Sequence, residues 1–313
     1  MTSKPIVILG VFVADTAYRA ERQPRMGETI LGTSFVLGPG GKGSNQSVAC
    51  GKLGADVSFI TRLGKDAFAE MAIKTWKAAG VKPAAIETPE SYTGAAYIFI
   101  ENGTGNNAII ISPGAAALIS PADIDANADL IRSASIFVTQ LEQPIDAAIR
   151  ALAIAKEAGV TTILNPAPAA PLPDSIYPLC DYVTPNETEA EGITGVAVAS
   201  VDDARRAADV LLKKGVGAAL ITLGEKGALL HTAQSSDLVP AYSVGPVVET
   251  TGAGDAFNGG FAVGLSRGFT PLDAARFGCA VAGISVTRPG TAPSMPTLAE
   301  AMAVFEPATL GGV

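Results

Sequence analysis

Segments with the pattern of buried strands alternate along this chain with segments that have the pattern of helices. Ile6–Ala14 is rich in Ile, Val and Leu and predicts a buried strand, and Ser44–Leu53 has helical spacing. The same order returns in the strand-like segment Ile136–Gln140 and the helix predicted from Pro144 to Ala158. Strands joined by helices form βαβ units, so the sequence predicts a three-layer α/β/α fold around a mostly parallel sheet.

Two regions, about 12–38 and 93–112, interrupt this alternation, because they contain strand-like pieces with no helix between them. Tyr97–Glu101 and Ala108–Ile111 flank the glycine-containing turn Gly103–Gly105 and predict a hairpin. Extra edge strands on the main sheet are the alternative. We expect instead a small separate antiparallel sheet from these two regions, placed as a lid over the ends of the main strands.

The composition suits one α/β domain spanning 1–313 that carries this discontinuous lid. Hydrophobic residues make up 48% of the chain, enough for a sizeable core. Acidic residues number 30 against 22 Lys and Arg, a net charge of −8, so no nucleic-acid or membrane partner is expected. The sequence shows neither a long apolar run nor a signal-peptide cleavage pattern, and a cytoplasmic location is therefore expected.

The cysteine and histidine content excludes several kinds of chemistry. The cysteines, Cys50, Cys180 and Cys279, lie far apart without a Cys-x-x-Cys pair, which argues against a disulfide framework and a zinc site. The single histidine, His231, ends an apolar run and belongs to no motif. Since Ser-His-Asp and Cys-His catalysis would each need that residue, we expect His231 to be a strand-end residue without a catalytic role.

The segment Glu249–Asn258, which reads Glu-Thr-Thr-Gly-Ala-Gly-Asp-Ala-Phe-Asn, is the most informative stretch for chemistry. The small residues Gly252, Ala253 and Gly254 let backbone N–H groups approach a ligand closely, and at a helix N-terminus such groups bind anions. Asp255 then falls in the first turn beside the anion. A carboxylate there suits the task of accepting a proton from an attacking hydroxyl. A helix start without a ligand is the alternative that this segment alone leaves open.

A second glycine-rich turn, Gly38–Gln46, also opens a predicted helix. It fails the Walker A pattern, because Gly43 follows the lysine and Val36 takes the position of the upstream glycine. It fails the dinucleotide fingerprint as well, which disfavours a dehydrogenase. Lys42 and Asn45 offer the mixed hydrogen-bonding groups that a hydroxyl-rich ligand needs, although a plain tight turn remains open.

Polar residues follow four other predicted strands, where ligands of parallel sheets bind. Asp15 and Glu142 each end a strand, and either carboxylate could accept two hydroxyl hydrogens of a vicinal diol or merely cap a turn. Asn186 and Glu189 have the spacing of a helix capping box, and also that of a pair beside Mg²⁺ and phosphate. Thr222–Gly227 follows a strand and could contact a nucleotide or form a simple strand connection.

Taken together and in this order, these segments resemble the ribokinase-like (pfkB) family of carbohydrate kinases, from Gly10 to about Pro296. Gly40–Gln46 and Thr251–Gly259 are similar to the two signature regions of that family. Within the family the resemblance is nearest to members that act on ribose. It rests on Ala14-Asp15, Gly27–Thr29, Gly41–Gln46, Gln140–Glu142 and Val286–Gly290 with Ser294.

The resemblance implies an ATP-dependent kinase that transfers the γ-phosphoryl group to a sugar hydroxyl, D-ribose giving D-ribose 5-phosphate. It implies a small β lid that also pairs subunits into a homodimer. A nucleoside kinase or another sugar kinase of the same family is one alternative, and a non-catalytic sugar-binding regulator is another. The catalytic aspartate and its glycines are retained, which favours an enzyme.

The resemblance also implies a role for particular residues. Asp255 would be the catalytic base, and Gly252, Ala253 and Gly254 the anion hole. The sugar would contact Val13, Ala14, Asp15, Gly41, Lys42, Gly43, Ser44, Asn45, Glu142 and Asp255. The nucleotide would contact Asn186, Glu189, Thr222, Leu223, Gly224, Glu225, Lys226, Gly227, Gly254 and Cys279, with Mg²⁺ near Glu189 through water. A potassium ion would lie among Glu249, Thr251, Ser285, Arg288, Gly290 and Ser294, several of them through backbone carbonyls.

The chain departs from the family pattern at three places. Glu249 stands where an aspartate is usual, and its longer side chain reshapes the expected potassium site. Val11–Val13 is apolar where a more polar stretch usually precedes the sugar-binding aspartate, so the substrate could be a sugar other than ribose. Cys279 stands where a polar or aromatic residue often faces adenine.

Overall fold

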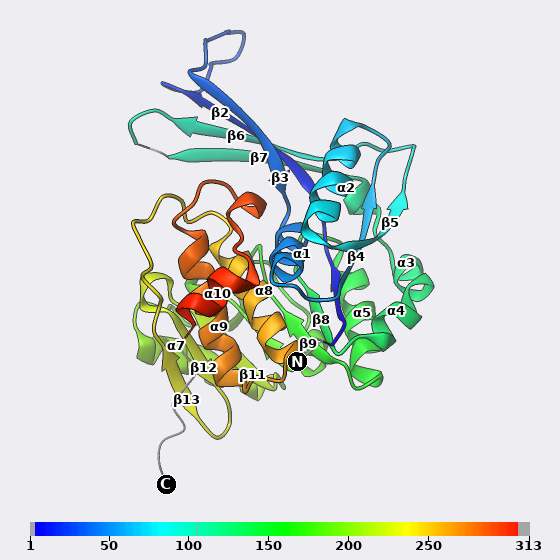
Figure 1. Cartoon of the computed structure of the whole chain (residues 1–313), viewed down its shortest axis with the longest axis vertical. Coiled ribbons are helices and arrows are strands. Elements are labelled where there is room, and N and C mark those ends of the chain that lie inside the picture. The colour runs from blue at the N-terminus through cyan, green and yellow to red at the C-terminus, as the bar shows by residue number, and fades with distance from the viewer. Residues whose placement is uncertain (1–3, 105, 306–313) are drawn as a thin grey trace.

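A computed structural model describes residues 4–104 and 106–305 of the chain, and it has the expected architecture (Figure 1). One sheet has nine strands in the order β13-β12-β11-β10-β9-β8-β1-β4-β5. Its strands are β1 (Ile6–Leu9), β4 (Val57–Leu63), β5 (Lys82–Glu87), β8 (Ile136–Thr139), β9 (Thr161–Leu164), β10 (Tyr182–Val183), β11 (Ala218–Thr222), β12 (Ala228–His231) and β13 (Ser236–Val239). The strands from β5 to β11 pair in parallel, whereas β12 and β13 pair antiparallel at one edge.

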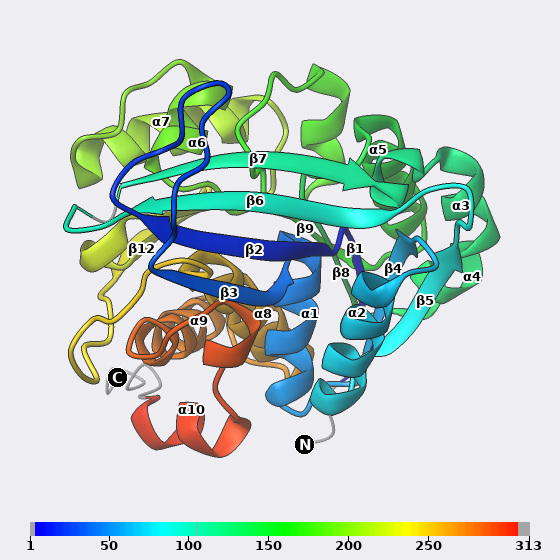
Figure 2. The same ribbon diagram turned by 90° about the horizontal axis from the view of Figure 1, so that it is seen from above.

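Helices cover both faces of this sheet (Figure 2). They are α1 (Lys42–Lys52), α2 (Ala67–Ala79), α3 (Pro121–Ala126), α4 (Ala128–Ser133), α5 (Ile145–Glu157), α6 (Glu187–Thr194), α7 (Val201–Lys213), α8 (Ala253–Ser266), α9 (Pro271–Ser285) and α10 (Leu298–Val304). The sequence of β1 is apolar throughout because both of its faces are buried. Ile6 and Ile8 pack into one core, and Val7 and Leu9 pack into the core on the opposite face.

Local signals in the sequence account for the ends of helix α2. The side chain of Asp66 accepts a hydrogen bond from the Ala69 N–H, and Gly80 ends the helix in the left-handed region with φ 77°. Trp76 is fully buried on this helix, and its indole N–H donates to the Ser44 hydroxyl over 2.9 Å. This contact joins α2 to α1, the helix that follows the second glycine-rich turn.

The single strand expected over Ile6–Ala14 is wrong, because the structure divides it into β1 and a lid strand. Gly10 lies at the break, against the first turn of α1. A Cβ on Gly10 would come within 2.7 Å of the Gly43 Cα, so only glycine lets the strand end and the helix approach this closely. The sequence patterns also did not predict β5, α3, α4 and α10.

The separate lid is present as a four-stranded sheet in the order β3-β2-β6-β7. Its strands are β2 (Val13–Ala20), β3 (Ser34–Gly40), β6 (Thr93–Glu101) and β7 (Asn107–Gly114). The expectation of an antiparallel sheet is only partly right, since β2 pairs with β6 in parallel. The predicted hairpin joins β6 to β7, and Gly105 of its turn lies outside the described residues.

The strand register places the lid residues in rows across the sheet. Gly38, Asp15, Ala96 and Ile111 form one row, and the next row on the same face is Val36, Ala17, Ile98 and Ile109. Val36, Ile109 and Ile111 are 62%, 52% and 55% exposed. The lid therefore presents a sugar-binding candidate, Asp15, together with uncovered apolar side chains on one face. Among residues 4–104 and 106–305, no helix combines the length and apolar composition needed to cross a bilayer.

Candidate active site

The candidate residues for phosphoryl transfer line one cavity of about 150 Å³. It opens where β9, β10 and β11 end and where α1, α6 and α8 begin, the position expected for ligands of a parallel sheet. Its walls are formed by Lys42, Asn165, Ala167, Thr184, Asn186, Glu189, Thr222, Gly252, Gly254, Asp255 and Asn258. Segments that are far apart in the sequence thus meet at one point.

The start of helix α8 has the geometry of an anion-binding turn. Gly252 caps the helix with φ 82° and ψ 0°, and a side chain there would press on Thr291. The Ala253 N–H is already used, because it donates to the Thr250 carbonyl over 3.1 Å. Within the described residues the N–H groups of Gly252 and Gly254 have no hydrogen-bond partner. Two of the three amides named from the sequence are therefore available to an anion.

Asp255 follows these amides and is only 6% exposed. Its carboxylate accepts hydrogen bonds from the side-chain amides of Asn45, over 3.0 Å, and Gln46, over 3.1 Å. Burial raises the pKa of Asp255, and the Lys42 ammonium and the two amide donors oppose that rise. A buried carboxylate whose basicity is increased, beside free N–H donors, can accept a proton from an alcohol.

The sugar-binding candidates form a cluster of charges next to Asp255. The Lys42 backbone N–H donates to Glu142 over 2.8 Å. Burial raises the pKa of Asp15 to about 6, with a further contribution from the charge of Asp255. Burial also raises the pKa of Glu142 to about 7, against the opposing charge of Lys42. For Lys42 itself, burial lowers the pKa, but the surrounding carboxylates outweigh it and the net pKa is raised.

Other residues predicted for the sugar site shape its backbone. Val13 is 5% exposed and Ala14 is fully buried at the start of the lid. Gly41 has φ 87°, and a side chain there would meet the Val11 carbonyl. Gly43 packs against Gly10. The Ser44 hydroxyl accepts the Trp76 hydrogen bond, so the structure directs this side chain to the core.

The nucleotide-binding candidates are divided between the cavity and its surroundings. Asn186 and Glu189 form the capping box of α6, each side chain accepting from the other's backbone N–H, and both also line the cavity. Thr222 lines it too, whereas Leu223 is buried and Gly224–Lys226 form a short helical turn that ends at Gly227. Cys279 is 5% exposed and packs in the core, so the structure does not bring it to the cavity wall.

The candidate potassium residues lie on two adjacent segments. Glu249 accepts a hydrogen bond from the Gly290 N–H over 2.8 Å, and Ser294 donates to the Thr291 carbonyl over 2.7 Å. Ser285 donates to the Ala282 carbonyl, and Arg288 pairs with Glu300 over 2.6 Å. No cluster of three His, Cys, Asp or Glu residues suited to a metal occurs in the described part of the chain. A monovalent cation in this region would be held by carbonyl and hydroxyl oxygens, and Glu249 is turned towards the Gly290 N–H.

Sequence reasoning did not single out Gln46, Asn165, Thr184 and Asn258. Thr184 and Asn165 follow strands β10 and β9, so their position at carboxyl strand ends is a signal that was available. Asn258 was visible within the phosphate-binding segment, where it accepts from the Thr184 hydroxyl over 2.6 Å and donates to the Gly254 carbonyl over 2.8 Å. These bonds fix the first turn of α8 against the sheet.

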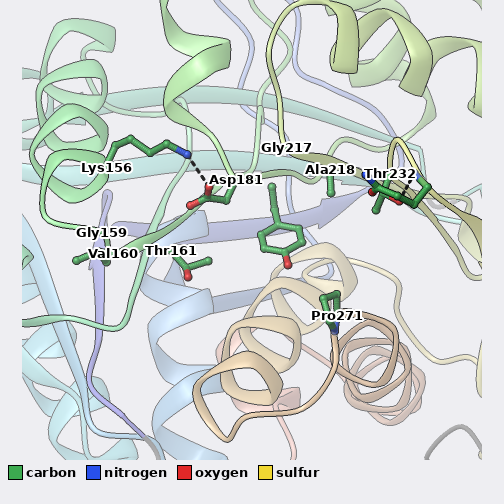
Figure 3. Close-up of a pocket in the computed structure, with 11 residues that line it drawn as sticks. Lys156, Gly159, Val160, Thr161, Asp181, Gly217, Ala218, Thr232 and Pro271 are labelled. Carbon is green, nitrogen blue, oxygen red and sulfur yellow. Dashed lines mark hydrogen bonds and ion pairs between the residues drawn. The ribbon is translucent and has the colours of Figure 1, made fainter. Parts of the chain in front are cut away.

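A larger cavity, of about 550 Å³, lies at the opposite, amino-terminal ends of β9, β10 and β11 (Figure 3). No residue predicted from the sequence lines it. Lys156 and Asp181 on its wall neutralise each other through a 2.6 Å ion pair. The small cavity is the better candidate for chemistry, since it gathers the unpaired N–H donors and the carboxylates with raised pKa.

Because the pKa of Asp15 is raised in the folded state, ionisation of this carboxyl group should lower the free energy of unfolding above about pH 4. Because the folded-state pKa is about 6 against 3.8 for the free group, stability is lost as the pH rises through this window. Asp15→Asn should therefore increase the free energy of unfolding at pH 8 by about 1–3 kcal/mol, with little difference at pH 4. Urea denaturation at both pH values measures this. Glu157→Gln, at an exposed carboxylate on α5, is the control, and a difference that does not change with pH would contradict the prediction.

Known proteins resemble this chain over nearly its full length. The model of the pfkB family carbohydrate kinases matches residues 4–298. A ribokinase of Haemophilus influenzae is 37% identical over 97% of this chain and 99% of its own length, and a deoxyribokinase of Salmonella typhimurium is 37% identical over 94% and 96%. The structure of Arabidopsis thaliana ribokinase complexed with ribose and ATP superposes with a TM-score of 0.92 at 30% identity, covering 97% of this chain and 99% of that one. The chain belongs to the pfkB family of carbohydrate kinases.

Proposed function

We propose that this protein is a cytoplasmic, ATP-dependent pentose kinase that converts D-ribose to D-ribose 5-phosphate. The observation that carries the proposal is the position of the buried Asp255 carboxylate, between the free amides of the α8 start and the cluster of Asp15, Lys42 and Glu142. Similar proteins include ribokinases, and one related structure is a complex with ribose and ATP. A regulator without activity would not need a base at this point.

In the proposed mechanism each part of the site has a separate task. Asp15, Asn45 and Glu142 hold sugar hydroxyls, and Asp255 accepts the proton of the hydroxyl that attacks the γ-phosphate. The transferring group carries its charge on equatorial oxygens, which the Gly252 and Gly254 N–H groups stabilise. Lys42 adds positive charge to the same space. Because these donors are fixed before the reaction, little reorganisation is needed.

Two cations belong to the proposal. Mg²⁺, with Glu189 as a ligand through water and Asn186 next to it, would neutralise phosphate charge when bound. K⁺ would be held by the oxygens of Glu249, Thr251, Ser285, Arg288, Gly290 and Ser294. Its charge would support the turn before α8, and the longer Glu249 side chain makes activation weaker than an aspartate would give.

Asp255→Asn tests the base. The variant should still bind the sugar, because its size and one hydrogen-bonding oxygen are kept, but turnover should fall at least roughly 10²–10³-fold. A coupled assay of ADP formation measures turnover, and calorimetry measures sugar binding. Near-wild-type turnover would overturn the assignment of Asp255.

A second candidate substrate is 2-deoxyribose, and one observation favours it. Val13 lies two residues before Asp15 on the same face of β2, so an apolar side chain adjoins the carboxylate expected to bind hydroxyls. Because 2-deoxyribose lacks one hydroxyl, it loses no hydrogen bond where an apolar side chain faces that position. A deoxyribokinase is also as similar to this chain as one of the ribokinases.

Activity measured on a panel of substrates decides between ribose and 2-deoxyribose. The panel should contain ribose, 2-deoxyribose, hexoses and nucleosides, each assayed for ATP consumption with and without K⁺. We expect the highest kcat/KM with ribose and a modest activation by K⁺. A higher value with 2-deoxyribose would select the second candidate, and rapid turnover of a nucleoside alone would overturn the pentose assignment.

The lid supports a further part of the proposal, a homodimer formed through the β lid. Val36, Ile109 and Ile111 are more than half exposed on the face that carries Asp15, and a second copy of the chain could cover them. Ile109→Lys should shift the protein from dimer to monomer in sedimentation velocity. Met302→Lys, at an exposed apolar residue of α10, should leave the dimer intact. A monomeric wild type would contradict the dimer.

A further inference from the structure

A chain of buried side-chain amides leads from the main sheet to the Asp255 carboxylate. Gln46 donates both of its amide hydrogens, one to Asp255 over 3.1 Å and one to the Asn165 side-chain oxygen over 3.0 Å. Gln140 donates to the Gln46 oxygen over 2.6 Å. Asn165 donates in turn to the backbone carbonyl of Thr184 over 3.0 Å. Gln46 and Gln140 are fully buried, so water cannot substitute for these partners.

The hydrogen-bond requirements allow Asn165 and Gln46 only one orientation each, whereas the side-chain oxygen of Gln140 is buried without a partner. The Thr184 carbonyl can only accept, so Asn165 must turn its NH₂ group to it and its oxygen to Gln46. Gln46 must then present its NH₂ group to Asn165 and to Asp255, and its oxygen to Gln140. The backbone carbonyl of Thr184, just after β10, thus determines that Gln46 presents an N–H donor to Asp255 and not its amide oxygen.

Asn45, the other donor to Asp255, is held less firmly. Its oxygen is buried without a hydrogen-bond partner, whereas both hydrogens and the oxygen of Gln46 are engaged. Because its oxygen is free, the Asn45 side chain can turn away from Asp255 and accept a hydrogen bond from a sugar hydroxyl. Gln46 cannot turn without breaking three hydrogen bonds, so it is the donor that remains on Asp255 when the sugar enters.

We propose that Gln46, held by Gln140 and Asn165, is a positioning residue that keeps the Asp255 carboxylate ionised and in one orientation during phosphoryl transfer. The inference rests on the proposed role of Asp255 as the base. It gives a function to two fully buried side chains, Gln46 and Gln140, and to Asn165 on the cavity wall.

The charges around Asp255 show why such a donor matters. Lys42 of α1 favours the ionised form, while burial and the nearby carboxylates of Asp15 on β2, Glu142 after β8 and Glu189 on α6 disfavour it. A neutral N–H donor stabilises the ionised carboxylate without adding charge that would compete with Lys42. Loss of that donor should therefore raise the pKa of the base.

The test uses Gln46→Met and Gln140→Met, with the pH dependence of kcat as the readout. In Gln46→Met the acid limb should move about one pH unit to higher pH, because a hydrogen bond to a charged group is lost. At neutral pH kcat should fall roughly tenfold to a hundredfold, with a smaller change in the KM for the sugar. Raising the pH should recover part of the rate. Gln140→Met, which touches neither Asp255 nor the substrates, should show a smaller shift in the same direction.

Gln143→Met is the matched control. Gln143 is 4% exposed and donates to the Thr139 hydroxyl and the Gln140 carbonyl, each over 2.7 Å, outside the amide chain. This variant should lose stability without a shift of the acid limb. If Gln46→Met does not fold, Gln140→Met still decides the matter. If the wild type is active and neither Gln46→Met nor Gln140→Met shifts the acid limb relative to it, this inference alone is overturned. A wild type without sugar kinase activity would overturn the proposed function as well.

Discussion

The burial of one carboxylate at the start of helix α8 is the constraint on which the site depends. Asp255 is 6% exposed, and its charge is balanced by Lys42 and by amide donors from Asn45 and Gln46. A buried carboxylate without such partners would be protonated and could not act as a base. The second glycine-rich turn supplies Lys42, Asn45 and Gln46 together, so that turn and the α8 start work as one unit.

Close packing of backbone positions each of the two glycine-rich segments. Gly10 and Gly43 let β1 and α1 approach, and the Gly252 cap fits against Thr291 only because it has no side chain. The Thr291 hydroxyl donates to the Pro39 carbonyl over 2.9 Å, which ties this region to the last residues of lid strand β3. The lid that carries Asp15 is therefore attached next to the anion-binding turn. A movement of the lid would change the sugar side of the site directly.

The parts of the structure that local rules govern could be predicted from the sequence. The α2 caps at Asp66 and Gly80, the parallel sheet and the separate lid follow from capping residues, hydrophobic periodicity and the break in strand–helix alternation. The break at Gly10 could not be predicted, because it depends on the contact with Gly43 some thirty residues later. The parallel pairing of β2 with β6 likewise depends on which strands meet after folding.

The site follows the same division. Asp255 and Lys42, predicted from the two glycine-rich turns, line the same cavity as Glu189, which was predicted from its position after a strand. The use of the Ala253 N–H by Thr250, and the side chain of Ser44 turned to Trp76, depend on three-dimensional contacts that spacing does not encode. The amide chain through Gln46, Gln140 and Asn165 joins segments from three parts of the chain, and only their juxtaposition shows that they lead to Asp255.

A crystal structure with D-ribose and a non-hydrolysable ATP analogue is the most direct measurement of the central claim. We expect the terminal phosphate within hydrogen-bonding distance of the Gly252 and Gly254 amides, and a sugar hydroxyl hydrogen-bonded to Asp255, with Gln46 unmoved. A nucleotide bound elsewhere, or a sugar whose hydroxyls all lie away from Asp255, would contradict it.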